Sequence, residues 1–222
     1  MGGADLLNIC FHGIGTPGRE LEPGEDGYWV AADRYLLILD EIATWPSAQI
    51  SFDDGNASDV EAGLPGLLER GLTARFFVLA GRLGSPGSLA ASDVRMLAAH
   101  GMSVGTHGMS HRSWRGMDPS TRQAELVEAR ERIQEASGCA VTEAACPMGR
   151  YDRRVLADLR ELGYERVYTS DRRTAVPGSW LQPRFSVRAD DSPESLRATV
   201  LRKPGPRQRT RQNLVGLAKR LR

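Results

Sequence analysis

Two adjacent carboxylates follow an apolar segment of the chain. Ile50–Phe52 leads directly into Asp53, Asp54 and Gly55. Neighbouring side chains of a regular strand point to opposite faces, but the alternation is lost where the chain turns, and a glycine permits a tight turn. The two carboxylates can then converge on one point, where one could hold a cation and the other could act as a base. An ordinary Asp-Asp-Gly turn is the alternative interpretation.

Two of the four histidines form a second group that could bind a metal. His107 and His111 are four residues apart, so within one helical turn their imidazoles would face the same way. With a carboxylate from Asp54 they would supply three ligands and leave positions open for water, which is typical of a catalytic site. Zn²⁺ is the expected ion for these ligands, although other divalent transition ions accept them. An ordinary surface turn is the alternative for the histidine pair.

Short apolar runs alternate with amphipathic segments and would position these groups. The runs predict strands at 6–11, 48–52, 74–80, 102–106, 141–146, 167–170 and 184–187, and helices at 30–43, 56–70, 92–100, 118–137 and 152–162. This alternation predicts one α/β domain with a mostly parallel sheet. Several predicted strands end in chemically capable groups, and active sites of α/β barrels collect at the carboxyl ends of the strands. We therefore expect one site at that end of the sheet.

Three motifs resemble, in order, the first three motifs of the polysaccharide deacetylases (the NodB-homology group, carbohydrate esterase family 4). They are 51–55 (Ser-Phe-Asp-Asp-Gly), 107–111 (His-Gly-Met-Ser-His) and 145–151 (Ala-Cys-Pro-Met-Gly-Arg-Tyr), and the resemblance covers about residues 8–187. It implies a distorted (β/α) barrel, here of about seven parallel strands. The catalytic domain would span 1–204, followed by a basic tail at 205–222. The implied activity is metal-dependent removal of N-acetyl groups from an N-acetylated sugar in a polysaccharide, oligosaccharide or glycan precursor.

The resemblance also implies roles for individual residues. Asp53 would be the catalytic base, and Asp54 would bind the metal with the two histidines. The third motif, Pro147, Met148 and Gly149, would line the substrate groove, with the backbone N–H of Met148 helping to hold the oxyanion. A bound divalent ion makes hydroxide available at neutral pH, and a base kept off the metal can take the proton.

The sequence departs from the family pattern in two places. The third motif usually begins with an arginine that orients the base, but Ala145 stands there. Arg184 is our candidate substitute, and a solvated arginine is the alternative. The late leucine-x-histidine motif, which supplies the general acid, is missing because no histidine follows His111. His12, after the first predicted strand, is our candidate acid, and a buried structural imidazole is the alternative.

Two further residues are candidates for the substrate pocket. Asp171, after the sixth predicted strand, could orient groups in the pocket, or it could belong to an ordinary turn. Trp114, close to the histidines, could form a wall on which a sugar ring stacks. A core tryptophan is the competing interpretation, because tryptophan buries a large area.

Composition and charge narrow the choice of partners and compartment. A net charge of +1 over 222 residues argues against a globally basic nucleic-acid binder, so no nucleic-acid partner is expected. Three widely spaced cysteines and the absence of a signal-like N-terminus favour a cytoplasmic location. After Glu194 there are nine basic residues and no acidic one, and 212–222 could form a short amphipathic helix. That tail could contact the inner membrane surface peripherally, or it could be solvated.

Two other functions remain open from the sequence. The protein could hydrolyse another non-peptide C–N bond on the same scaffold, or it could be a non-catalytic relative that binds metal or sugar. The presence of Asp53 argues against a pure binder, because a binder needs no base. The missing late histidine argues for one.

Overall fold

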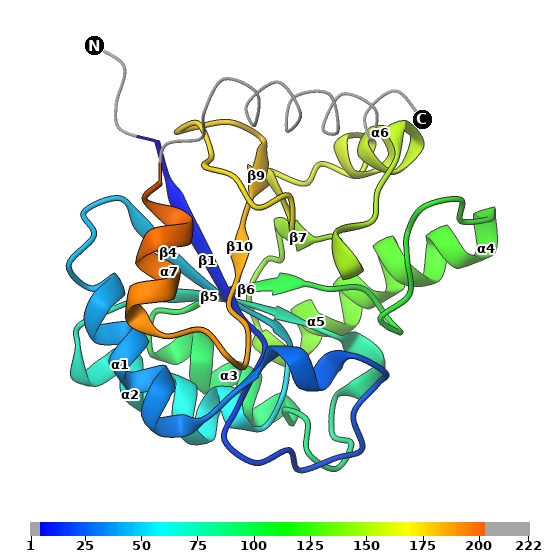
Figure 1. The fold of residues 1–222 in the computed structure, drawn as a ribbon. Helices are drawn as coiled ribbons and strands as arrows, with labels where there is room; N and C mark the ends of the chain where they lie inside the picture. Colours follow the sequence, from blue (N-terminus) through cyan, green and yellow to red (C-terminus); the bar gives the residue numbers. More distant parts are fainter. Residues whose placement is uncertain (1–4, 203–222) are drawn as a thin grey trace.

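Eight parallel strands form one sheet that curves into a nearly closed barrel (Figure 1). The computed structural model describes residues 5–202. In sheet order the strands are β10 (Phe185–Ser186), β1 (Leu7–Phe11), β4 (Ala48–Asp54), β5 (Ala74–Val78), β6 (Ser103–Thr106), β7 (Glu143–Ala145), β8 (Arg166–Thr169) and β9 (Leu181–Pro183). The predicted distorted (β/α) barrel is confirmed.

The last two strands close the barrel. Arg184 alone separates β9 from β10; β9 pairs with β8, and β10 pairs with β1 at the other end of the sheet. The side-chain amide of Asn8 adds a link across this seam by donating to Gln182 Oε1 (3.0 Å) and to the carbonyl of Pro183 (3.1 Å). Counted as one segment, β9 and β10 bring the strand number to the predicted seven, although the last strand begins earlier than predicted.

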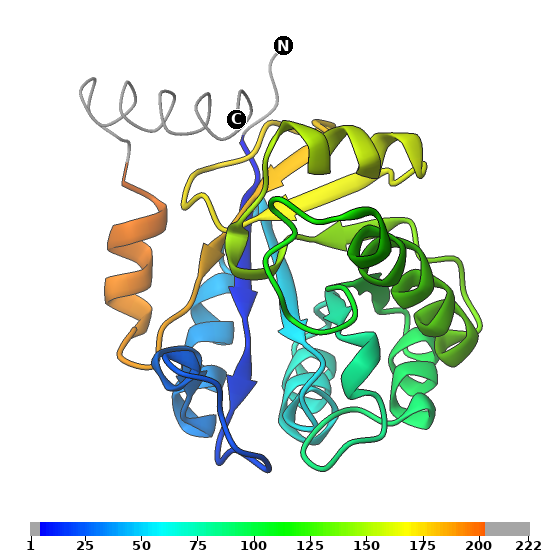
Figure 2. The ribbon, with the colours of Figure 1, turned by 90° about the vertical axis from the view of Figure 1, so that its right-hand side faces the viewer.

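The helices lie outside the strands. They are α1 (Ala32–Ile42), α2 (Leu64–Glu69), α3 (Ala91–Ala99), α4 (Pro119–Arg122), α5 (Ala129–Ser137), α6 (Arg153–Glu161) and α7 (Pro193–Val200). Figures 1 and 2 show α7 on one side of the strands and α4 and α5 on the opposite side. The predicted helices at 56–70 and 118–137 each contain a π-helical stretch, at Asp59–Gly63 and Gln123–Glu128. Helix α7 was not predicted.

Alternation along the strands decides what faces the barrel interior. Phe11, Phe52 and Phe76 occupy matching positions on β1, β4 and β5, and their rings stack with centroids 5.4 and 4.7 Å apart. Tyr35 of α1 packs against Phe11, so these rings face the outer helices. Because successive side chains alternate, Asp53 on β4 points inward.

A second, two-stranded sheet completes the described fold. Strands β2 (Gly13–Ile14) and β3 (Trp29–Val30) form this sheet around the loop that follows β1.

In the part of the chain that the structure describes, no helix has the length and apolar character needed to cross a bilayer. The amphipathic helix predicted at 212–222 lies outside the described residues, so its membrane contact stays a prediction.

Candidate active site

Asp53 is buried inside the barrel and paired with Arg184. Arg184 Nη1 lies 2.6 Å from Asp53 Oδ1 and Nη2 lies 2.7 Å from Oδ2, while Nη1 also donates to Ser51 Oγ at 3.0 Å. Neither side chain is appreciably exposed. Burial alone would raise the pKa of Asp53, but the charge of Arg184, followed by that of His107, holds it well below its usual range. The carboxylate is therefore ionised and fixed in orientation.

Aromatic rings enclose the guanidinium of Arg184. Its central carbon lies 5.2 Å from the ring centroid of Phe77 and 5.8 Å from that of Tyr168. Ala145 is buried in one cluster with these two rings. Ala145 therefore lines the interior at the position where the family usually has an arginine. The positive charge beside Asp53 comes instead from Arg184, in the segment between β9 and β10. Arg184 is thus buried rather than solvated.

Asp54, His107 and His111 converge on one point beside Asp53. Asp54 Oδ1 lies 3.6 Å from His107 Nε2 and 3.5 Å from His111 Nε2, and the three candidate ligand atoms lie within 4.8 Å of one another. Both Asp54 oxygens are buried and have no hydrogen-bond partner. An orphaned buried carboxylate is costly unless a cation satisfies it. Two imidazoles facing that carboxylate fit a divalent ion.

The second nitrogen of each imidazole is held by a neighbouring acceptor. His107 Nδ1 lies 2.9 Å from the carbonyl of Ala145, and His111 Nδ1 lies 2.7 Å from Glu22 Oε2. A carbonyl can only accept, so Nδ1 of His107 carries the proton, and a carboxylate imposes the same tautomer on His111. Both Nε2 lone pairs are then free to face Asp54, which is the usual orientation of metal-binding histidines.

The segment from His107 to His111 is not the helical turn predicted from its spacing. Gly108 has a φ of 88° and His111 a φ of 53°, and both values are incompatible with a right-handed helix. Glu125 holds this loop by accepting from the Met109 N–H and the Ser110 hydroxyl. The imidazoles therefore converge because the loop curls around a buried carboxylate.

Backbone strain is concentrated around the same point. Within residues 5–202, four non-glycine residues have positive φ, and three of them are Asp54 (78°), His111 (53°) and Met148 (56°). Conformations of this kind each cost about 1–3 kcal/mol and persist where the surroundings enforce them, often at functional sites. This observation points to the predicted site independently of any motif.

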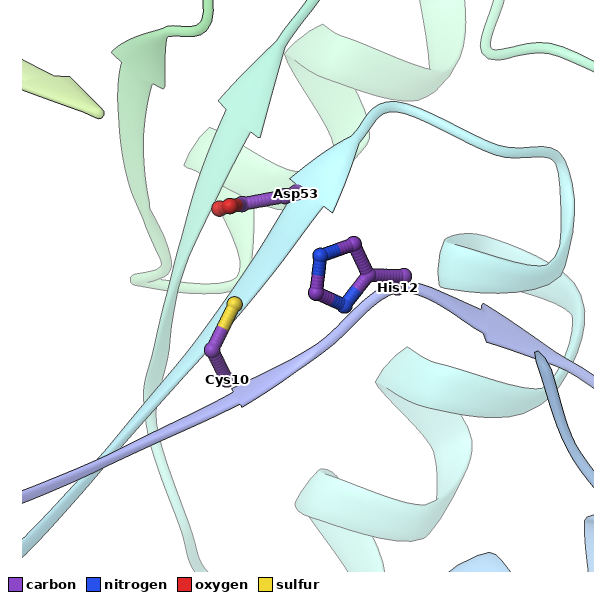
Figure 3. A group of neighbouring side chains, drawn as sticks. All are labelled: Cys10, His12 and Asp53. Atoms are coloured by element: carbon purple, nitrogen blue, oxygen red, sulfur yellow. The ribbon is translucent and has the colours of Figure 1, made fainter. Parts of the chain in front are cut away.

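His12 lies beside the base. It is half-buried, and its ring centroid is 5.0 Å from that of Tyr28. A ring nitrogen of His12, the sulfur of Cys10 and a carboxylate oxygen of Asp53 lie within 4.8 Å of one another (Figure 3). His12 Nδ1 is buried without a hydrogen-bond partner. The imidazole is therefore within reach of the site rather than tied into the core.

The remaining predicted residues divide into two groups. Pro147–Gly149 forms a tight turn in which Met148 is 51% exposed, and Asp171 accepts hydrogen bonds from Tyr151 and Thr169, both at 2.8 Å. Trp114, by contrast, is fully buried in a core cluster, and its Nε1 lies 3.3 Å from Glu125. The prediction that Trp114 stacks on a sugar is wrong, because the loop turns its ring inward.

Glu22 was missed by the sequence analysis. The nearby Glu25 is buried and forms an ion pair with Arg19. Glu25 Oε2 accepts from the Glu22 backbone N–H at 2.8 Å, and Arg82 pairs with the Glu22 side chain. These contacts hold Glu22 against His111. No motif marks a residue that lies 89 positions earlier in the chain.

Comparisons with known proteins show the family of this chain. The polysaccharide deacetylase family model matches residues 43–167, more than half of the chain. YxkH of Bacillus subtilis (strain 168) is 25% identical over 182 residues, and the match covers 76% of this chain and 65% of YxkH. The chain thus belongs to the polysaccharide deacetylase family, although it spans less than two thirds of that relative.

Solved structures show the same fold. The Streptococcus pyogenes deacetylase PplD superposes with a TM-score of 0.75 at 18% identity, covering 90% of this chain and 99% of PplD. IcaB from Ammonifex degensii gives a TM-score of 0.72 at 20% identity, covering 90% of this chain and 99% of IcaB. At such identities the likeness concerns the fold alone.

Proposed function

We propose that this protein is a metal-dependent hydrolase that removes N-acetyl groups from an N-acetylated sugar in a polysaccharide, oligosaccharide or glycan precursor. One observation carries the proposal: an ionised, buried Asp53 lies next to Asp54, whose orphaned oxygens face two imidazole nitrogens. This arrangement separates a base from a metal ligand on adjacent residues. Membership of the polysaccharide deacetylase family supports the choice of an acetylated sugar.

Asp53 would act as the base. A divalent ion held by Asp54, His107 and His111, with Zn²⁺ our first choice, would supply Lewis-acid activation of water and of the acetyl carbonyl. Asp53 Oδ2 lies 3.8 Å from His107 Nε2, so the base is close to this ligand set while its own oxygens are held by Arg184. It would accept a proton from the attacking water, a role worth about 10² to 10⁴ in rate.

His12 would protonate the departing amine. It lies beside Asp53, and its Nε2 is turned towards that carboxylate (Figure 3). An imidazole suits this role because it can hold a proton and release it to a leaving amine. His12 would thus replace the missing late histidine from the opposite end of the sequence. The Met148 N–H, on its exposed turn, would face the oxyanion.

The substrate would enter beside Glu22. A cavity of about 390 Å³ is lined by residues that include Glu22, Arg82 and Ser88. Since Glu22 also contacts His111, this cavity adjoins the candidate metal ligands. Its mixture of charged and hydroxyl groups suits a hydroxyl-rich sugar better than an apolar ligand. The PplD structure contains acetate, the product that the proposed reaction would release.

Acetate release from a panel of N-acetylhexosamine oligomers would test this proposal. The purified protein should release acetate only when loaded with a divalent ion, and loading with Zn²⁺, Co²⁺ and Mn²⁺ in turn would rank the metals. Asp53→Asn should lower turnover by at least about 10²-fold while the ion at Asp54, His107 and His111 still binds. One bound ion with no acetate from any oligomer would overturn the proposal and favour another C–N substrate or a binding role.

A further inference from the structure

A second group of metal-ligating atoms lies next to the proposed base. We propose that Cys10, His12 and Asp53 form a second, inhibitory metal site, which takes a thiophilic divalent ion such as Cd²⁺ or excess Zn²⁺. The sulfur, imidazole nitrogen and carboxylate oxygen lie within 4.8 Å of one another, and Figure 3 shows the three side chains converging between β1 and β4. The claim of inhibition rests on the proposed function; the claim of binding does not.

The strand register builds this site. Cys10 on β1 is directly paired with Ser51 on β4, and Asp53 lies two residues further along on the same face. His12 follows the end of β1, where the chain turns. Cys10 and Asp53 are buried, whereas His12 is half-buried, so an ion would enter from the side of His12.

The donor set selects the kind of ion. Thiolate and imidazole ligands favour Zn²⁺ and its soft relatives, whereas Mg²⁺ and Mn²⁺ prefer oxygen ligands. The ligand group of Asp54, His107 and His111 contains no sulfur. A thiolate–metal bond would therefore be a signature of the second site alone. The ring nitrogen of His12 that faces Cys10 and Asp53 is Nε2 (Figure 3), and its lone pair would bind such an ion.

The neighbouring guanidinium makes this site weaker than the first. Arg184 pairs with both oxygens of Asp53, and its positive charge repels an incoming cation. Each carboxylate oxygen still has a second lone pair to offer. The ion must also displace the proton of the Cys10 thiol, so each bound ion releases one proton to solvent and gains a thiolate ligand. Occupation would then require excess metal, and it would engage both the proposed base and the proposed acid.

Titration of metal-free protein with Cd²⁺ or Co²⁺ tests the site without reference to hydrolysis. We expect two equivalents to bind, the second accompanied by a sulfur-to-metal charge-transfer band. Cys10→Ser should lose that band and one equivalent, while still binding the other. Cys146→Ser is the matched control, because Cys146 is also a buried thiol but is in neither group of candidate metal ligands found among residues 5–202. It should behave as the wild type.

Inhibition gives the second readout. Excess Zn²⁺ should inhibit wild type and Cys146→Ser, excess Mn²⁺ should not, and Cys10→Ser should resist excess Zn²⁺. A band absent from wild type, or one that persists in Cys10→Ser, would overturn the site. If Cys10→Ser does not fold, His12→Ala must lose the same band. Two-equivalent binding with the band, in a protein that releases no acetate, would keep the site and reject only the proposed function.

Discussion

Arg184 and Asp53 are each buried with a full charge, so each depends on the other. Removing one partner of such a pair leaves an uncompensated charge in the interior. The guanidinium neutralises the charge of Asp53, and its two parallel hydrogen bonds also fix the plane of that carboxylate. Lysine keeps the charge but not this geometry.

Arg184→Lys should therefore lower turnover by about 10²-fold through misplacement of the base, with metal affinity unchanged. Arg184 lowers the pKa of Asp53, so Arg184→Gln should raise it and move the acid limb of the pH–rate profile to higher pH. Arg197→Lys is the control and should change neither quantity, because Arg197 is an exposed side chain that pairs with Glu41. An acid limb that stays in place in Arg184→Gln would show that Arg184 does not tune the base.

Glu22 orients His111 from the opposite side of its ring. Loss of such an outer partner typically costs 10- to 100-fold in metal affinity, so we expect Glu22→Gln to weaken metal binding by about that factor. Competition with a chromophoric chelator would measure it. Glu20→Gln, on the same loop but exposed, should bind as the wild type does. Equal affinities in all three proteins would leave Glu22 as a partner of Arg82 only.

At the scale of elements, the loop after β6 depends on Gly108. A Cβ at this position would press on Glu125 and lie 2.9 Å from Trp114 Nε1, and its φ of +88° already disfavours any other residue. Gly116 has a similar φ of +75° but has no atom within 4 Å of an added Cβ. The two glycines therefore separate conformational cost from steric cost.

Gly116→Ala should cost about 1–2 kcal/mol in unfolding free energy and leave metal affinity intact. Gly108→Ala should cost more and also weaken metal binding, because displacing Glu125 releases the segment that carries His111. Thermal denaturation and metal titration of both variants would measure these effects. Wild-type metal affinity in Gly108→Ala would show that the loop tolerates the shift.

The elements differ in how well the sequence predicts them. Apolar runs located every long strand, because a strand covered by helices must be apolar, and the order of the motifs located Asp54 and both histidines. The four-residue spacing of the histidines predicts a helical turn. That prediction is wrong, because the positive φ of Gly108 takes the backbone out of the helical conformation. Trp114 lies near His111 in the sequence yet belongs to the core. Proximity along the chain does not reveal which way a loop turns a side chain.

Helix α7 and Glu22 were missed for different reasons. The start of α7 is marked in the sequence by Ser192, whose side chain caps the helix, and by Pro193 at its first turn. The basic residues that follow Glu194 favour a solvated or membrane-contacting tail instead, and they obscure this helix start. Glu22 had no such signal, because its role depends on a contact between distant loops.

For the molecule as a whole, Asp59 couples stability to pH. It is fully buried, and neither carboxylate oxygen has a hydrogen bond of ordinary geometry. Burial first, then the charges of Asp54 and Asp53, raises its pKa well above the usual range. The folded state thus keeps a proton that the unfolded chain loses above about pH 4. The free energy of unfolding therefore falls as the pH rises from about 4 towards the raised pKa of folded Asp59, by up to about 1.4 kcal/mol per pH unit.

Asp59→Asn removes this titration while nearly preserving shape. The variant should be more stable than the wild type at pH 7, and the difference should shrink towards pH 4. Denaturant unfolding of the metal-free protein at several pH values would measure it, with the exposed Asp26→Asn as control. Parallel stability curves for Asp59→Asn and wild type would contradict the assignment.

The split closing strand has a consequence for how the molecule is made. Asp53 and Arg184 are 131 residues apart, and the seam between Asn8 and Gln182 spans 174. Contacts of such long range form late, because a large loop must close before they stabilise anything. During synthesis the base is made long before its counter-charge. We therefore expect docking of the segment around Arg184 to complete the wall of the barrel and the active site together.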